Sequence, residues 1–465
     1  MSHPVAATAH TVPARPPRSA WWALVVLTLA QAMLVLDVTV VNVALPRLSA
    51  DLGLGADLAG WAIAAYAVPF GGLLLLGGRL SDAVGARRML LIGLGIFVAG
   101  SLAAGLSTGV VGYLGARALQ GVGAALLSPA ALASLLRRFD GPARRRALAI
   151  WGAVGGGGAA LGLVVGGLLT GGPGWRWVFF INVPIGIVVA ILVPILLAAV
   201  SPIRGRRIGV VATLCATLGL AALIGAASVS GVQGGALSLV LAIVGVLLLG
   251  LFAIVERFSV QPLIRPALLA GRAMATGSLL MLVTTALLVG NLLLLSFFVQ
   301  DAAGWSATAT GLAFLPIAIA LVAGAQGGGH LLGRLGSRRI APIGAAISAI
   351  GLGLAAWAVA LEQPIAAIAA TTLAALGFGI NLVTGSTTAL GRVAHEESGS
   401  ASGAVNAAHE VGSASGAAIF AMLGVALSAS SALGWAATVA VATTVLAALV
   451  LPNVIPAPGE ARRGH

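Results

Sequence analysis

The chain is built from apolar runs of about 20 residues, the length at which an α-helix crosses the hydrocarbon core of a bilayer. Apolar residues make up 59% of the sequence and charged residues only 8%, which is unlike a soluble domain of this size. The runs do not alternate between polar and apolar residues, so membrane β-strands are excluded as well. The sequence therefore predicts an all-α membrane protein that crosses the bilayer many times.

Arg, Pro and Gly interrupt the hydropathy and divide the sequence into about 14 predicted spans. The spans lie near 20–43, 58–78, 88–107, 111–136, 147–171, 177–200, 208–228, 236–256, 274–298, 309–331, 340–360, 365–390, 402–427 and 434–452. We expect one membrane-spanning helix over each range, joined to the next by a short loop.

The basic residues indicate how the chain is oriented in the membrane. All 25 are Arg, and 22 of them fall on one side of the membrane if the N-terminus is cytoplasmic. Only Arg47 and Arg176 fall in the loops of the other side. By the positive-inside rule, this bias predicts a multi-pass protein of the cell membrane with both termini cytoplasmic. Since the arginines are spread over short loops, the net charge of +13 does not indicate nucleic-acid binding.

A repeated loop indicates that the chain has two related halves. GRLSDAVGARR (78–88) aligns with GHLLGRLGSRR (329–339) at a constant offset of 251 residues. Parallel duplication of this kind is typical of transporters. It predicts one six-helix bundle over 20–200 and a second over 261–452, with two inserted helices over 201–260. Cytoplasmic tails at 1–19 and 453–465 complete this division.

One carboxylate stands inside the first predicted span. Asp37 lies in LDVTVVNVALP (36–46), and its helical neighbours three and four residues away are all apolar. A carboxylate in hydrocarbon costs several kcal/mol unless it is paired, protonated or in contact with water. We therefore expect a partner from another helix.

Arg117 is the only arginine well inside a predicted span, and its guanidinium cannot be deprotonated. At about 1.5 Å per helical residue, Asp37 and Arg117 both lie roughly 9 Å below the outer face. Tyr113 and Gln120 share the helical face of Arg117. This depth predicts an Asp37–Arg117 ion pair or a water-mediated link, with either a structural or a proton-coupling role.

Four motifs resemble those of one known family. They are LDVTVVNVALP (36–46), GRLSDAVGARR (78–88), RALQGVGAALLSP (117–129) and WRWVFFINVPIG (175–186). Together they are similar to the motifs of the major facilitator superfamily, and in particular of its fourteen-helix drug:proton antiporter branch. The resemblance covers essentially the whole chain. It implies two six-helix bundles with two helices inserted between them, and proton-coupled export of drugs.

The loop motif suggests a gate. Asp82 can cap a helix start or pair with an Arg of a neighbouring loop, and Gly85 permits a tight turn. A polar latch on the cytoplasmic side and a turn with topology-setting arginines are both open interpretations. Ala83 stands where the family usually has Arg. The candidate gating residues are Gly78, Asp82, Gly85, Arg87, Arg88, Arg334 and Arg338.

The fifth span is rich in glycine and resembles the antiporter motif that ends G-P-x-x-G-G. Leu163 stands at the proline of that motif, which removes the expected kink. Glycines four residues apart allow helices to approach closely, and close packing and a role in coupling both remain open. The residues concerned are Gly158, Gly162, Gly166 and Gly167.

Glu410 is the second carboxylate well inside a span, about 12 Å from the inner face, with Asn406 on its helical face and His409 rotated away. Two interpretations of Glu410 are open. In the first it relays protons or contacts a cationic substrate; in the second it is protonated and hydrogen-bonded to a neighbouring helix. Other candidates for a substrate cavity are Asn42, Tyr66, Phe70, Tyr113, Gln120, Asn291 and Asn406. Interhelical hydrogen bonding and aromatic packing explain these residues equally well.

The function predicted from the sequence is proton-coupled export of amphiphilic or cationic compounds by alternating access. The chain shows no catalytic triad, metal cluster or nucleotide loop, so we expect no enzyme activity and no cofactor. We expect a monomer whose partners are the bilayer, protons and a small substrate. The alternatives are export of one antibiotic or metabolite, uptake of a small metabolite, and a membrane sensor or scaffold that does not transport.

Overall fold

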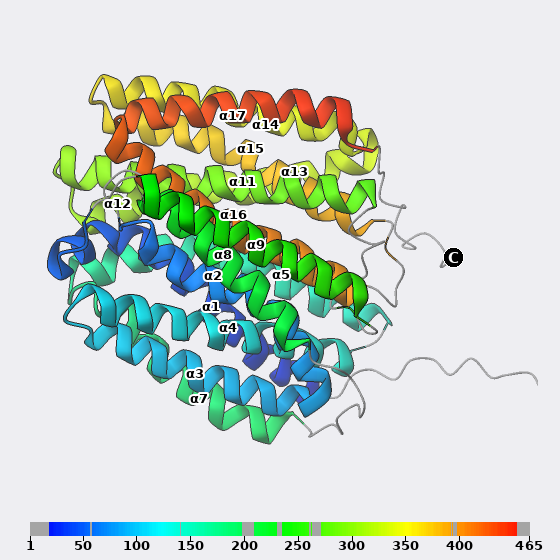
Figure 1. Cartoon of the computed structure of the whole chain (residues 1–465). Helices are drawn as coiled ribbons and strands as arrows, with labels where there is room; N and C mark the ends of the chain where they lie inside the picture. Colours follow the sequence, from blue (N-terminus) through cyan, green and yellow to red (C-terminus); the bar gives the residue numbers. More distant parts are fainter. Residues whose placement is uncertain are drawn as a thin grey trace, which may run out of the picture.

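The computed structural model describes residues 18–55, 58–139, 141–197, 209–229, 235–259, 262, 271–391, 393 and 398–452. Within these ranges every regular element is a helix, and the helices run roughly side by side (Figure 1). The first half contains α1 (Arg18–Leu52), α2 (Trp61–Val84), α3 (Ala86–Leu106), α4 (Val110–Arg138), α5 (Gly141–Gly171), α6 (Trp177–Phe180) and α7 (Asn182–Leu196). Residues 1–17 of the predicted N-terminal tail, the C-terminal tail and the arginines at 204, 206 and 207 lie outside the described residues, whereas residues 18 and 19 already belong to α1.

The second half begins with α11 (Arg272–Phe297) and continues without a break into the π-helical turn η1 (Phe298–Ala302). It then contains α12 (Ala307–Ala313), α13 (Leu315–Leu335), α14 (Ser337–Ala360), α15 (Pro364–Leu390), α16 (Ser398–Ala426) and α17 (Ala429–Val450). Between the halves lie α8 (Val210–Val229) and α9 (Gly235–Phe258).

The helices match the predicted spans one to one, when α6 with α7 and α12 with α13 are each counted as one interrupted span. Eleven stretches of the described residues are long and apolar enough to cross a membrane. The all-α membrane fold with 14 spans is therefore confirmed. Several predicted limits were displaced: α2 continues to Val84 instead of 78, and α5 begins at Gly141 instead of 147. The largest difference is in α1, which continues to Leu52 because Arg47 ends the apolar run without ending the helix, which also contains Pro46.

Helices pack mainly within their own half. In the first half α1 packs against α5 and α7, and α4 packs against α2 and α3; in the second, α15 packs against α11, α13 and α14. The halves meet where α2 contacts α16, where α5 contacts α12 and α13, and where α1 contacts α11. This packing is consistent with two bundles, whose residue limits remain predictions.

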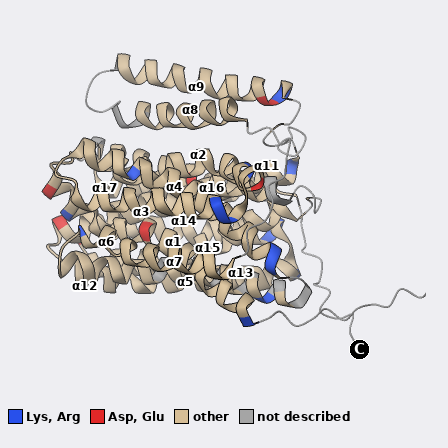
Figure 2. Cartoon of the chain, turned by 90° about the horizontal axis from the view of Figure 1, so that it is seen from below, with Lys and Arg blue, Asp and Glu red and all other residues tan. Residues whose placement is uncertain are grey.

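The inserted helices form a hairpin at one edge of the molecule (Figure 2). α8 packs against α2 and against α16, so it touches both halves, while α9 packs against α8. α9 exposes large apolar side chains such as Leu247, Ile254 and Phe258. Such a surface suits contact with lipid.

The repeated loops have the same backbone turn in both halves. Gly85 (φ 104°) separates α2 from α3, and Gly336 (φ 76°) separates α13 from α14. Both glycines are in a conformation that side chains rarely adopt, which explains why glycine recurs at this point. The turn predicted at Gly85 is therefore confirmed, and its counterpart lies in the second half.

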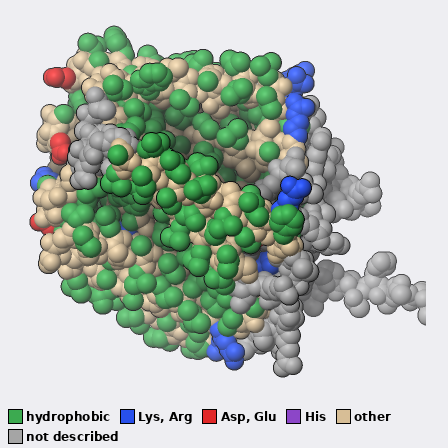
Figure 3. Space-filling view, viewed as in Figure 1, with side chains coloured by type: hydrophobic (Ala, Val, Ile, Leu, Met, Phe, Trp, Pro, Cys, Tyr) green, Lys and Arg blue, Asp and Glu red, His purple; other side chains and the backbone are tan. Residues whose placement is uncertain are grey.

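Charged side chains gather at the two ends of the helices, and the surface between the ends is apolar (Figure 3). The arginine end, as we call it, is the end at which α3 and α14 begin, with Arg87, Arg88 and Arg338 in their first turns. The acidic end is the opposite one, at which α1, η1 and α14 end, with exposed Asp51, Asp301 and Glu362.

At the acidic end the two halves are in close contact. The Gln300 side-chain amide donates to the Val43 carbonyl (3.0 Å). A Cβ atom added to Gly167 of α5 would lie 2.7 Å from the Ala307 carbonyl oxygen, and one on Gly311 would lie 2.6 Å from the Leu163 carbonyl oxygen. The chain is therefore closed at this end, by packing that only glycine permits.

Candidate functional site

Asp37 and Arg117 form a buried ion pair between α1 and α4. Arg117 Nη1 lies 2.5 Å from Asp37 Oδ2, and the exposed fractions of the two side chains are 1% for Arg117 and 0% for Asp37. The contact predicted from their equal depth is therefore present. Its role in proton coupling remains a prediction.

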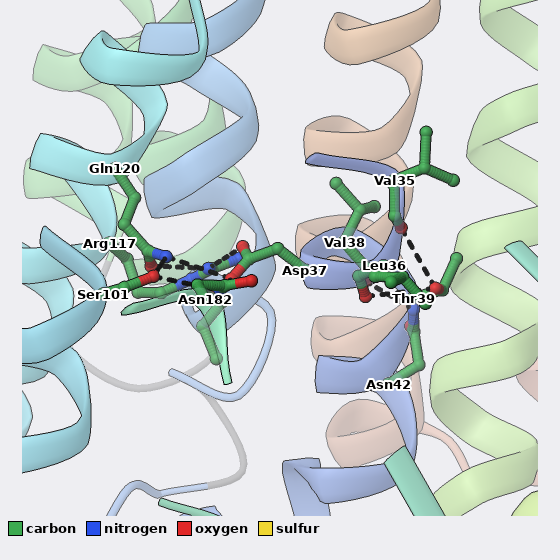
Figure 4. A network of polar contacts seen from close by, with 11 residues as sticks. Val35, Leu36, Asp37, Val38, Thr39, Asn42, Ser101, Arg117, Gln120 and Asn182 are labelled. Carbon is green, nitrogen blue, oxygen red and sulfur yellow. Dashed lines mark hydrogen bonds and ion pairs between the residues drawn. The ribbon is translucent and has the colours of Figure 1, made fainter. Parts of the chain in front are cut away.

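Two side-chain amides complete the surroundings of the Asp37 carboxylate (Figure 4). Its Oδ1 atom accepts hydrogen bonds from Gln120 Nε2 (3.0 Å) and Asn182 Nδ2 (2.9 Å). The same two amides donate to Ser101 Oγ, at 2.6 Å and 3.0 Å. Gln120 also accepts a bond from Arg117 Nη1 (2.8 Å). Since an ionised carboxylate only accepts hydrogen bonds, this arrangement fits Asp37 in its charged form.

The Arg117 guanidinium lies close to two aromatic rings. Its Cζ atom is 4.5 Å from the centroid of Tyr66 on α2 and 5.6 Å from that of Phe179 on α6. Its Nε atom donates to the Ala62 carbonyl at 3.4 Å. Cation–π contacts and a buried counter-ion together compensate the loss of water around this charge.

Asn182, Ser101 and Phe179 were not predicted as site residues. Asn182 and Phe179 belong to WRWVFFINVPIG (175–186), which we used only as a mark of the family branch. A single Ser within the apolar run of α3 carries no signal of its own. The useful signal was the amide of Asn182, a strong hydrogen-bonding group in a segment that is otherwise almost entirely apolar.

The same segment is bound to the end of α1. Trp175 Nε1 and Arg176 Nη1 donate to Asp51 Oδ2, at 2.9 Å and 2.5 Å. Arg176 Nη2 donates to the Ser107 carbonyl, at the end of α3. The loop before α6 is thus held at the acidic end by a half-exposed ion pair and an indole hydrogen bond.

In the loop motif, Asp82 pairs with an arginine and does not begin a helix. It lies in the last turn of α2, and its Oδ1 is 3.4 Å from Arg137 Nη2, at the end of α4. Of the two roles predicted for Asp82, capping a helix start and pairing with an arginine, the structure shows the pairing. Gly78 lies within α2, Arg87 and Arg88 lie in the first turn of α3, Arg334 in the last turn of α13 and Arg338 in the first turn of α14.

The glycines of α5 face two helices. A Cβ on Gly158 would contact Val35, one on Gly162 would overlap Thr39, and one on Gly166 would lie 2.9 Å from the Val40 carbonyl oxygen. Gly167 faces α12 instead. The packing interpretation explains these contacts, and a role in coupling stays a prediction.

Glu410 lies at the crossing of α2 and α16, away from the hydrogen-bond network of Asp37. A Cβ on Gly71 would lie 2.6 Å from the Cβ of Glu410, so the helices are very close there. The Glu410 carboxyl is 3.3 Å from His409 Nδ1, although we expected His409 to be rotated away. Asn406, one turn earlier, is exposed.

The candidate cavity residues do not form one site in this conformation. Tyr66, Tyr113 and Gln120 are buried around Arg117, and Phe70 packs on Tyr66 with ring centroids 5.6 Å apart. Asn42 donates to the Val38 carbonyl of its own helix. Within the described residues, the amide of buried Asn291 has no hydrogen-bond partner, and no group of three or more metal-ligating side chains occurs.

Fourteen apolar spans, two halves with an equivalent turn, and a buried ion pair define a polytopic α-helical membrane transporter. Residues 27–417 match the Major Facilitator Superfamily, and the chain belongs to that family. It is a transporter and not an enzyme.

Curated relatives place the chain in the fourteen-helix branch. It is 38% identical to the puromycin resistance protein pur8 of Streptomyces alboniger, over 83% of this chain and 78% of that protein. It is 37% identical to the cephamycin export protein CmcT of Amycolatopsis lactamdurans, over 83% and 81%. The methyl viologen resistance protein SmvA of Salmonella typhimurium is 33% identical, over 83% and 78%.

Solved structures show the same fold at low sequence identity. The POT family transporter PepTSo superimposes with a TM-score of 0.67 at 15% identity, over 94% of this chain and 98% of that one. A D-xylose–proton symporter gives a TM-score of 0.65 at 15% identity, over 94% and 99%.

Proposed function

We propose that this transporter exports amphiphilic or cationic compounds in exchange for protons. The observation that carries the proposal is the fully buried ion pair of Asp37 and Arg117. Arg117 keeps its charge, so a proton on Asp37 leaves an uncompensated cation between α1 and α4. Protonation therefore changes the relative stability of two arrangements of these helices, which is what proton coupling requires.

The proposed direction, export, rests on the resemblance to drug exporters, and the proposed cycle also needs an orientation. We propose that the arginine end is cytoplasmic and that both termini lie there, in agreement with the positive-inside rule. The structure is closed at the acidic end by contacts such as Gln300 with Val43. In the proposed cycle the external side opens to take up a proton and release the substrate, and the cytoplasmic side releases the proton and binds the next substrate.

Two substrate ranges are compatible with the site. The carboxyl group of Glu410, at the crossing of α2 and α16, favours amphiphilic cations. Export of a single antibiotic is the second candidate, because two relatives are named for puromycin resistance and cephamycin export. We propose a monomer, since the two halves supply all residues named above.

The test uses inverted membrane vesicles with an acidified interior and a panel of cationic, neutral and antibiotic compounds. We expect at least one compound to dissipate the pH gradient with the unmodified protein and none with Asp37→Asn. Glu362→Gln, which neutralises an exposed carboxylate at the acidic end, is the matched control and should behave like the unmodified protein. Equal activity of Asp37→Asn would overturn the proposal and favour a scaffold.

A further inference from the structure

A short segment, residues 175–182, connects the acidic end of the molecule to the Asp37 carboxylate. At its start, Trp175 and Arg176 bind Asp51 at the end of α1. At its end, Asn182 binds Asp37 in the same helix. Any movement of this segment relative to α1 at the acidic end must therefore change the hydrogen bonds of Asp37.

The segment is held as one packed unit. Phe179 is fully buried, and its ring centroid lies 6.2 Å from that of Trp175 and 5.8 Å from that of Tyr113. The same ring lies over the Arg117 guanidinium. Because aromatic packing fixes Phe179, Trp175 and Asn182 cannot shift independently by much.

The hydrogen bonds around Asp37 select its charged form. Arg117, Gln120 and Asn182 all donate to the carboxylate, and Ser101 Oγ holds both amide NH₂ groups in this orientation. A proton on Asp37 would need an acceptor where three donors already point. Such a proton would weaken these three hydrogen bonds, so the donors favour the charged form.

Among the residues that the structure describes, few other charged or titratable groups face this carboxylate. Arg117 comes from α4, and Tyr66 from α2 lies against its guanidinium. Tyr113 of α4 reaches the site through Phe179. Glu410 of α16 packs on α2 beside Gly71. On α6, α7 and α3, the groups that contact the site are Phe179, Asn182 and Ser101, and none of them titrates.

We propose that Asn182, oriented by Ser101, is the positioning residue that favours loss of the proton from Asp37 while residues 175–182 are bound to α1 at the acidic end. The O–H bond of Asp37 breaks, the proton passes to water, and Arg117 balances the carboxylate that remains. Movement of this segment away from α1 withdraws Asn182 and lets Asp37 take up a proton again. This inference rests on the proposed function. It names the residue that determines when Asp37 loses and regains its proton.

The experiment measures the protonation of Asp37 directly and needs no substrate. Dicyclohexylcarbodiimide reacts with protonated carboxyl groups in apolar surroundings, and mass spectrometry locates the label. The purified full-length protein in detergent is labelled across a pH series from about 5 to 9. The measured quantity is the pH at which half of Asp37 is labelled, and Glu410 in the same sample serves as the reference carboxyl.

We expect Asn182→Ala to raise this pH by about one unit, a tenfold change in proton affinity, because one donor to the charged form is lost. Ser101→Ala, which removes only a hydroxyl group, should shift it in the same direction. Arg176→Gln should do so by a smaller amount. Asn381→Ala is the matched control, since Asn381 is a buried asparagine of α15, and one orientation of its side-chain amide would bond to Ala341 and Ala345 of α14.

An unchanged half-labelling pH in both Asn182→Ala and Ser101→Ala would overturn the inference. An unchanged value in Arg176→Gln alone would remove the connection to the acidic end. Equal shifts in Asn381→Ala or at Glu410 would show a general loss of packing and would also overturn it. None of these results bears on whether Asp37→Asn abolishes substrate-driven proton flux, so the proposed function is tested separately.

Discussion

Arg117 of α4 balances the charge of Asp37 of α1, although the two residues are 80 positions apart in the chain. Both side chains are removed from solvent, so neither charge has an alternative partner in water. Breaking such a pair costs more than forming it gains, because the remaining charge stays buried. Because of this asymmetry, protonation of Asp37 would strongly change the stability of the arrangement in which the pair is buried.

Arg117→Ala should destabilise the protein by about 3–5 kcal/mol, because Asp37 is left as a buried anion with only amide donors. Adding Asp37→Asn should recover part of this loss. Thermal unfolding in detergent measures both effects, and Arg138→Ala, at the exposed end of α4, is the control. A double variant no more stable than Arg117→Ala would show that the pair is energetically independent.

Gly167→Ala should hinder closure of the acidic end, because the new Cβ would lie 2.7 Å from the Ala307 carbonyl oxygen and 2.9 Å from the Gly311 Cα. Backbone atoms cannot rotate out of the way. In a Cys215→Ser background, a cysteine introduced at buried Val299 should then react several-fold faster with a membrane-impermeant maleimide. Gly95→Ala, where the added Cβ meets open space, should leave the rate unchanged. Equal rates in both variants would contradict the prediction.

Asp82→Asn should change stability by less than about 1 kcal/mol, because its pair with Arg137 is partly exposed. If the pair acts as a latch, the transport rate should nevertheless fall, and added salt should mimic the substitution in the unmodified protein. Transport assays in vesicles at low and high ionic strength measure this. An unaltered rate in Asp82→Asn would favour the alternative, a turn whose arginines only set topology.

Glu410→Gln should distinguish between cationic and neutral substrates. Loss of the carboxylate removes an attraction to a positive charge, so transport of a cationic compound should fall roughly tenfold, which corresponds to about 1.4 kcal/mol. Transport of a neutral amphiphile should change little. Parallel uptake assays in inverted vesicles give the comparison. Equal losses for both compounds would support the other interpretation, a glutamate that only bonds to a neighbouring helix.

Much of the fold was predictable from local pattern. Runs of apolar residues located the helices, and the glycine shared by the two repeated loops predicted the turn found at Gly85 and at Gly336. Counting residues from the helix ends also placed Asp37 and Arg117 at the same depth in the membrane. Two isolated charges at the same depth have few other partners. Each of these inferences needed only helix geometry and the cost of burying charge.

By itself, the sequence determined which segments cross the membrane and where the repeat lies, and it indicated which two charges lie at one depth. The tertiary structure alone decided that Asn182 and Ser101 share the Asp37 carboxylate, and that Glu410 lies against Gly71. The reason is physical: in a membrane every helix is apolar, so hydropathy does not say which faces touch. Which faces touch depends on small residues and hydrogen-bonding groups on helices that are distant in the sequence. These contacts can be identified only once the helices are packed.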